Sequence, residues 1–163
     1  MIGVMADSHD NIKAVEKAVE FFNKNEVDLV LHAGDIVSPF TLEPFKKLRG
    51  EFKAVYGNNE GDKFNLNRKL KDFDTELTDL LEITYGEKRI AVYHGQNPSI
   101  LDSIVKSGKY DVVVTAHTHT PEVTLEENTL VVNPGETCGY LTGVKTVALL
   151  DVAEMKAEIV ELE

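Results

Sequence analysis

Residues 2–35 read IGVMADSHDNIKAVEKAVEFFNKNEVDLVLHAGD, and this stretch decides the fold. Residues 2–6 are a continuous apolar run, which is typical of a strand buried in a parallel sheet, and a second buried strand is expected over residues 27–33. A helix is expected over residues 10–24, because apolar residues recur there at spacings of three and four. Its apolar face consists of Ile12, Val15, Val19 and Phe22. A strand, a helix and a second strand in this order predict a parallel sheet with crossover helices.

The first half of the chain continues this alternation. A short helix is expected over residues 38–48, where Pro44 is tolerated only in a first turn. A third strand is expected over residues 52–56. Residues 61–79 are polar with spaced apolar residues, and we expect a helical excursion there to which the sequence assigns no role.

The second half has a different pattern, dominated by hairpins. The expected hairpin strands are residues 78–84 with 89–93, 123–126 with 130–133, and 144–151 with 155–162. Asn97 followed by Pro98 predicts the start of a helix, and Gly108 predicts its end. A further buried strand is expected over residues 112–115. Together the two halves predict an α/β fold of two packed sheets with helices outside, and the lack of linkers or repeats predicts a single domain over residues 1–163.

The composition limits the partners of this chain. Its formal net charge is −11, from 17 lysines and arginines against 28 aspartates and glutamates. The densest basic cluster, residues 68–71, is followed by Asp72 and Asp74, so we expect a solvated helix face and no non-specific binding to duplex nucleic acid. No stretch approaches the about 20 apolar residues that span a bilayer, so no membrane association is expected. The single cysteine, Cys138, excludes an intrachain disulfide and favours a reducing, cytoplasmic location.

Polar residues that can bind metal follow several of the expected strands. These residues are Asp7 and His9 after the first strand, Asp35 after the second, Asn58 after the third, His94 after residues 89–93, and His117 and His119 after residues 112–115. Ligands of open α/β sheets bind outside the carboxyl ends of the strands, so these seven side chains are expected to converge. Taken singly, each has an ordinary explanation as a cap, a turn or a buried histidine.

The combination of these residues predicts a metal centre. Four of the five histidines belong to the set, and the fifth, His32, lies three residues before Asp35. Imidazole, carboxylate and carboxamide donors suit manganese, iron, cobalt, nickel or zinc, and of these we favour Mn²⁺ or Ni²⁺. Seven ligands are too many for one four-coordinate zinc, whereas they suit two divalent ions about 3.5–4 Å apart.

In this order, Asp7-x-His9, Gly34-Asp35, Gly57-Asn58, His94 and His117-x-His119 resemble the motifs of the calcineurin-like metallophosphoesterases, and the size resembles the small YfcE-type phosphodiesterases. The resemblance covers nearly the whole chain, including the segment Asn133-Pro134-Gly135. It implies a four-layer α/β/β/α sandwich and a hydrolase that acts on a small phosphodiester. It implies the following ligands: Asp7, His9 and His119 for one metal, Asn58, His94 and His117 for the other, and Asp35 as the bridge. A bridging hydroxide would attack phosphorus, with Asp35, Asn58 and His94 as catalytic residues.

Three positions depart from the motifs of the family. Asn59 stands where many of these phosphatases have a histidine that serves as general acid or phosphate contact, and Gln96 stands where some small relatives have a second histidine. Ala116 replaces the usual glycine before His117, which we expect to be harmless. His32 is expected in its strand or just past it, supporting Asp35. The proton donor for the leaving group is therefore left unassigned.

Two other functions stay open. The chain could be a non-catalytic scaffold, like the retromer subunit related to this family, although every expected ligand position is filled. It could also be a phosphomonoesterase. A haloacid-dehalogenase-type phosphatase needs Asp-x-Asp after the first strand, where this chain has Asp7-Ser8-His9, and an amidohydrolase needs a barrel of about 250 residues. The sequence is compatible with a homo-oligomer and does not fix its order.

Overall fold

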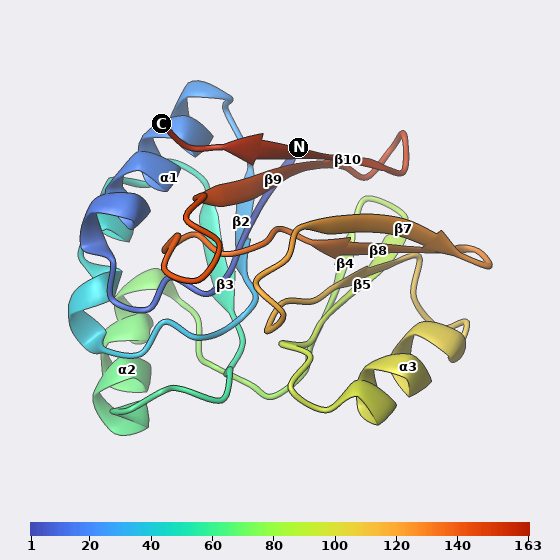
Figure 1. The fold of residues 1–163 in the computed structure, drawn as a ribbon, viewed down its shortest axis with the longest axis horizontal. Helices are drawn as coiled ribbons and strands as arrows, with labels where there is room; N and C mark the ends of the chain where they lie inside the picture. The colour runs from blue at the N-terminus through green and yellow to red at the C-terminus, as the bar shows by residue number, and fades with distance from the viewer.

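The structure, a computed structural model, describes residues 1–163 and contains two five-stranded sheets. The first sheet consists of β1 (Ile2–Met5), β2 (Leu29–His32), β3 (Glu51–Ala54), β9 (Thr146–Asp151) and β10 (Lys156–Glu161). The second consists of β4 (Leu81–Tyr85), β5 (Lys88–Val92), β6 (Val112–Val114), β7 (Glu122–Glu126) and β8 (Thr129–Asn133). Their strand orders are β10-β9-β1-β2-β3 and β4-β5-β6-β8-β7. The two sheets lie face to face (Figure 1).

Each sheet has a parallel part and antiparallel edges. Strands β1, β2 and β3 are parallel, and so are β5, β6 and β8. The crossovers run through α1 (Ile12–Lys24) between β1 and β2, and through α3 (Pro98–Lys106) between β5 and β6. The three expected hairpins are confirmed as β4–β5, β7–β8 and β9–β10. The carboxyl ends of the six parallel strands therefore define one edge of each sheet, here called the carboxyl edge.

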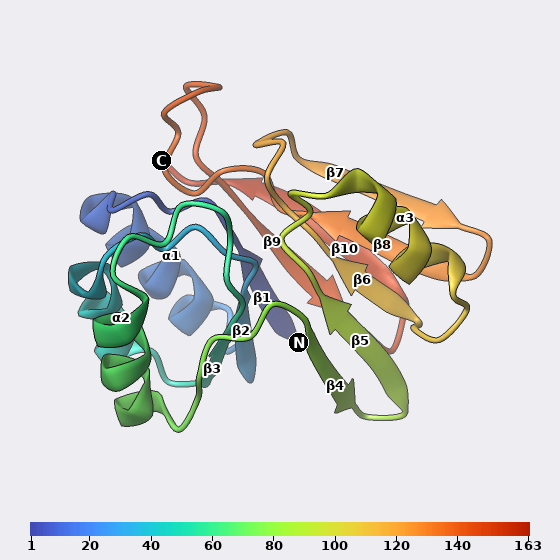
Figure 2. The same cartoon turned by 90° about the horizontal axis from the view of Figure 1, so that it is seen from below.

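Helices cover the outer faces of both sheets. Helix α1 and helix α2 (Lys63–Leu70) lie outside the first sheet, and α3 lies outside the second (Figure 2). Side chains alternate between the two faces of a strand, so β2 contributes to two hydrophobic cores. Leu29 and Leu31 lie in the core between the two sheets, whereas Val30 lies in the core between the first sheet and α1. A third, smaller core joins α3 to its sheet through Val105 and Val113. The expected four-layer α/β/β/α sandwich is confirmed.

Local sequence signals explain where α1 and α3 begin. The side chain of Asn11 accepts a hydrogen bond from Ala14 N and caps α1, and the side chain of Asn97 accepts from Ser99 N and caps α3. The expected helical excursion in 61–79 is confirmed as α2 followed by a 3₁₀ turn, with Leu66 and Leu70 fully buried. None of the helices combines the length and the hydropathy needed to cross a membrane.

The expectation of one helix over residues 38–48 is wrong. The structure has two 3₁₀ turns there, Pro39–Leu42 and Pro44–Lys47. Pro44 has no N–H to donate to the preceding turn, so it begins a new turn at its first position. A pattern of apolar residues does not distinguish a 3₁₀ turn from an α-helix over so few residues.

Candidate metal centre

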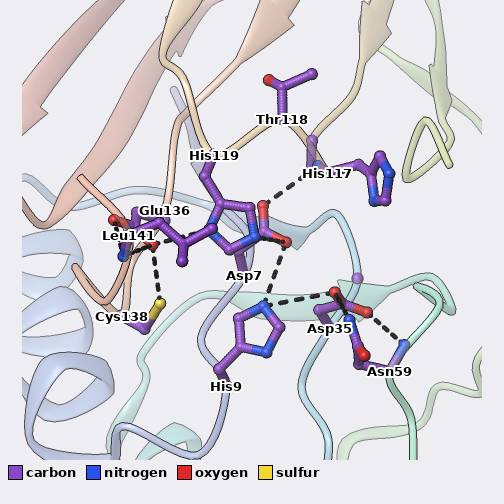
Figure 3. A network of polar contacts seen from close by, with 12 residues as sticks. Asp7, His9, Asp35, Asn59, His117, Thr118, His119, Glu136, Cys138 and Leu141 are labelled. Carbon is purple, nitrogen blue, oxygen red and sulfur yellow. Dashed lines mark hydrogen bonds and ion pairs between the residues drawn. The ribbon is translucent and has the colours of Figure 1, made fainter.

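The seven residues expected to bind metal lie together at the carboxyl edge. Asp7 and His9 follow β1, Asp35 follows β2, Asn58 follows β3, His94 follows β5, and His117 and His119 follow β6. Both sheets contribute, so residues 110 positions apart come into contact: His117 N donates to Asp7 Oδ2 at 3.3 Å. Figure 3 shows this convergence for the side chains of Asp7, His9, Asp35, His117 and His119.

The first group of potential ligands consists of Asp7, His9 and His119. Asp7 Oδ1 lies 3.7 Å from His9 Nε2 and 3.5 Å from His119 Nε2. The Asp7 side chain is fully buried, yet neither Asp7 Oδ1 nor His9 Nε2 has a hydrogen-bond partner. Buried polar atoms without partners are costly, and two that point at each other indicate a site for a third, positively charged group.

The second group consists of Asn58, His94 and His117. Asn58 Oδ1 lies 3.0 Å from His94 Nε2 and 2.8 Å from His117 Nδ1. The other ring nitrogen of His94, Nδ1, lies 2.7 Å from the carbonyl oxygen of Ala33, to which it donates. In neutral His94 the lone pair of Nε2 therefore faces the Asn58 oxygen, and a cation between these two acceptors would satisfy both.

Asp35 lies between the two groups. Its Oδ2 atom is 3.5 Å from His9 Nε2 and also 3.5 Å from His94 Nε2. These separations exceed hydrogen-bond lengths and lie just above the about 3.0–3.4 Å between neighbouring ligand atoms around an ion with bonds near 2.1 Å. The donor set of nitrogen and oxygen atoms also suits a divalent first-row metal. The residues present therefore fit two divalent ions that share Asp35.

The backbone at this edge is unusual. Five of the seven residues have a positive φ: Asp7 (49°), His9 (40°), Asp35 (61°), His117 (70°) and His119 (61°). Such left-handed conformations are uncommon for residues other than glycine, and they collect at functional sites where the surrounding fold enforces them. The fold thus holds these side chains in place at a local energetic cost.

The electrostatics of the centre favour positive charge. Burial would raise the pKa of Asp35, but the nearby imidazole of His94 and the hydrogen bonds from Asn59 outweigh it, so the pKa is well below its ordinary value. The nearby carboxylate of Asp7 raises the pKa of His9. Burial lowers the pKa of His94, but the contact with Asp35 outweighs this and raises it. The site attracts protons for the same reason that it would attract metal ions.

His32 lies within β2 and faces the helical layer, not the metal centre. Its Nδ1 accepts a hydrogen bond from Gly34 N at 3.2 Å, so the ring proton is on Nε2 and is donated to Ser8 Oγ at 2.9 Å. Ser8 Oγ in turn lies 3.5 Å from the carbonyl oxygen of Asp35. The expected support of Asp35 is therefore indirect. Complete burial lowers the pKa of His32 to about 3, which keeps the ring neutral.

The structure shows the surroundings of the three residues that depart from the family motifs. Asn59 donates from its backbone and its side chain to the carboxylate of Asp35, at 2.8 and 2.7 Å. Gln96 is exposed. Ala116 is buried, and its N–H donates to the carbonyl oxygen of His94 at 2.8 Å, so the extra methyl group relative to glycine is accommodated.

One residue of this site was missed by the sequence analysis. Glu136 follows β8 at the same carboxyl edge, and its Oε2 lies 2.8 Å from His119 Nδ1 (Figure 3). Its side chain is fully buried. Burial would raise its pKa, but hydrogen bonds from His119, Thr142 and Leu141 outweigh burial and lower the pKa to about 2. Its place after a strand, directly behind the motif Asn133-Pro134-Gly135, is only a weak signal, because a single carboxylate has no ligand spacing.

Known proteins resemble this chain over its whole length. The family model of the calcineurin-like phosphoesterase superfamily domain matches residues 1–155. A phosphodiesterase of Methanocaldococcus jannaschii is 39% identical, and the match covers 99% of both chains. A solved archaeal phosphodiesterase superposes with a TM-score of 0.95 at 38% identity, again covering 99% of both chains. YfcE, a phosphoesterase from E. coli, shares the fold with a TM-score of 0.67, 15% identity and 99% coverage of both chains.

Proposed function

The chain belongs to the calcineurin-like phosphoesterase superfamily, and we propose that it is a phosphodiesterase with a dinuclear centre of divalent metal ions. One observation carries this proposal: Asp35 Oδ2 is 3.5 Å from a nitrogen of each ligand group, which is the position of a bridging carboxylate. Asp7, His9 and His119 would hold one ion. Asn58, His94 and His117 would hold the other.

The metal ions and the protein have separate tasks in this proposal. When bound, a pair of divalent ions supplies a bridging hydroxide nucleophile at neutral pH and neutralises charge on the phosphoryl group. Asp7 and Asp35 would cancel two of the four positive charges, so the centre keeps a positive field that attracts a phosphodiester anion. This field lets a chain of net charge −11 bind an anionic substrate without a basic patch.

The protein groups position the reacting atoms. Ala33 O fixes the orientation of His94, and the two hydrogen bonds from Asn59 fix the carboxylate of Asp35. Preorganised groups of this kind lower the barrier because no rearrangement is needed when charge develops. Asp35, Asn58 and Asn59 do not protonate the leaving oxygen, because none of the three residues is an acid at neutral pH.

The substrate class is proposed from the relatives. The M. jannaschii relative is a phosphodiesterase, and we extend that activity to this chain for small phosphodiesters. The histidine content of the centre supports Mn²⁺ or Ni²⁺, with Fe, Co or Zn as alternatives. Cys138 is buried and unpaired, which supports a cytoplasmic location, and a homo-oligomer is compatible with these features.

The experiment that tests this function is a substrate panel on metal-stripped protein. The protein is reloaded with Mn²⁺, Ni²⁺, Zn²⁺ or Mg²⁺ singly and assayed with diesters and with the corresponding monoesters. We expect metal-dependent hydrolysis with diesters preferred. A preference for monoesters would make the chain a phosphomonoesterase, and no turnover of any ester by protein shown to contain two metals would favour the scaffold.

A further inference from the structure

Glu136 contacts a residue of the metal centre through the nitrogen that would not bind metal. Its Oε2 lies 2.8 Å from His119 Nδ1, whereas His119 Nε2 lies 3.5 Å from Asp7 Oδ1 on the opposite side of the ring. Figure 3 shows the ring of His119 between the two carboxylates. Each ring nitrogen therefore faces a different carboxylate: Nδ1 is hydrogen-bonded to Glu136, whereas Nε2 faces Asp7 without a hydrogen bond.

Glu136 receives hydrogen bonds from the loop that follows it. Tyr140 N donates to Oε2 at 3.2 Å, Leu141 N lies 3.0 and 3.1 Å from the two oxygens, and Thr142 Oγ1 donates to Oε1 at 2.7 Å. Thr142 N and Cys138 Sγ donate as well. A carboxylate has about four lone-pair sites, so these donors leave no room for a proton on Glu136.

This set of donors also excludes a metal ion at Glu136 itself. His119, Glu136 and Cys138 lie close enough together to resemble a ligand group. However, Nδ1 of His119 and three consecutive backbone N–H groups point at the carboxylate, and a cation there would face their positive ends. The group is therefore a hydrogen-bonded carboxylate rather than a third metal site.

The backbone around Glu136 fixes it relative to Asp7. Thr137 N donates to Ala6 O at 2.9 Å, and Cys138 N donates to Asp7 O at 3.1 Å. The side chain of Asn11 donates to Cys138 O at 2.9 Å. Backbone hydrogen bonds thus hold the segment that contains Glu136 against the residues that follow β1, among them Asp7.

We infer that Glu136 is a positioning residue that fixes the tautomer and the orientation of His119 for metal binding. An ionised carboxylate accepts only, so His119 must carry its proton on Nδ1, and the lone pair of Nε2 then points toward Asp7 and the proposed ion. The negative charge also makes the imidazole a stronger ligand. Among the other histidines, His94 has a neutral partner at Nδ1, the Ala33 carbonyl. The ion held by Asp7, His9 and His119 should depend on Glu136 more than the second ion does.

This inference rests on the proposed function, because it concerns an ion that the proposed centre would hold. Partners of this kind change metal affinity by about 10–100-fold. Glu136→Gln keeps the size of the side chain but removes the charge and presents an NH₂ group to the donors of the loop. Thr142→Val is the matched control, because it removes one hydrogen bond to Glu136 and leaves the contact with His119.

The test combines a spectroscopic signature with metal binding. Nitrogen NMR of histidine-labelled, metal-stripped protein at pH 8, above the ordinary histidine pKa of about 6.5, gives the tautomer of His119, assigned with His119→Gln. Calorimetric titration with Mn²⁺ gives the affinity of each site. We expect a proton on Nδ1 in the wild type and in Thr142→Val. For Glu136→Gln we expect mixed tautomers and about 10–100-fold weaker binding of one of the two ions.

Three results would overturn the inference. The first is a His119 proton on Nε2 in the wild type, and the second is an unchanged tautomer with unchanged Mn²⁺ affinity in Glu136→Gln. The third is an equal loss of Mn²⁺ affinity in Thr142→Val, which would mean that Glu136 only holds the loop. If Glu136→Gln does not fold, the wild-type tautomer still decides. If the stripped wild type takes up no metal, the proposed function fails, while the tautomer still reports on the role of Glu136.

Discussion

Asn59 donates two hydrogen bonds to Asp35, from its backbone N–H to Oδ1 at 2.8 Å and from its side-chain amide to Oδ2 at 2.7 Å. The residue that replaces the histidine of many relatives thus holds the carboxylate between the two ligand groups. An amide does not release a proton at neutral pH, so Asn59 positions Asp35 and does not donate a proton to the leaving group.

The first prediction is that hydrolysis depends strongly on the acidity of the leaving group, and that Asn59→His weakens this dependence. General acids contribute about 10²–10⁴-fold, so alkyl diesters should gain most from the new imidazole, whereas nitrophenyl diesters should gain little. The measurement is kcat/KM for diesters graded by leaving-group pKa, on the wild type and on Asn59→His.

Metal content is the control for this series, because Asn59→His also removes a hydrogen bond to Asp35. Both proteins should contain the same number of metal ions when they are compared. A flat dependence in the wild type would mean that another group already protonates the leaving oxygen.

The second prediction is that Gly57→Ala disrupts the centre while Gly61→Ala does not. A Cβ at position 57 would lie 2.1 Å from Asp35 Oδ1 and 2.6 Å from Asp35 N, so the carboxylate must move. Displacing such a group by about 1 Å can cost about 10²-fold in rate. At position 61 the nearest atom, Val37 O, would be 3.8 Å away, an ordinary contact. Metal content and kcat of both variants test this, and near wild-type values for Gly57→Ala would contradict the geometry.

The third prediction concerns stability at low pH. The pKa of buried His32 is lowered to about 3 in the folded protein. Its contribution to the free energy of unfolding is therefore complete above pH 6.5. This contribution decreases as the pH falls, because only the unfolded chain takes up the proton. The loss should be about 2 kcal/mol between pH 6.5 and 5. In His32→Leu this part of the pH dependence should disappear, although two hydrogen bonds are also lost. Urea unfolding of both proteins at pH 7, 6 and 5 gives the comparison, and equal slopes would show that His32 does not titrate on unfolding.

The convergence of the seven side chains could be predicted from the sequence because each of them follows a predicted strand. Strand order and parallel direction then place them at one edge, whatever their separation along the chain. Glu136 was missed because a single carboxylate has no ligand spacing, and its partners at 140–142 are mostly backbone N–H groups that no side-chain pattern specifies. The sequence placed His32 in or just beyond its strand, but its bond to Ser8 depends on which face of β2 packs against the helices. The single domain over residues 1–163 stays a prediction.

The fourth prediction is that Mn²⁺ or Ni²⁺ restores activity to stripped protein better than Mg²⁺. Four histidines line the centre, and Mg²⁺ prefers oxygen ligands and retains its waters. Activity at equal concentrations of each ion provides the measurement. Full activity of chelator-treated protein without added metal would rule out the two-metal mechanism.

The last prediction compares two ligands with different parts in the centre. Asp35 lies 3.5 Å from a nitrogen of each of the two ligand groups. His9 belongs to the first group only, where it lies near Asp7 and Asp35. Asp35→Asn should therefore lose more metal and more activity than His9→Ala, because in the proposed centre the charge of Asp35 would serve both ions.

The most direct test of the dinuclear centre is the number of Mn²⁺ ions bound per chain by stripped wild type and by Asp35→Asn, measured by calorimetry and elemental analysis on the same samples. The account predicts two ions in the wild type and fewer than two in Asp35→Asn. Two full equivalents bound by Asp35→Asn, or saturation of the wild type at one ion, would contradict it.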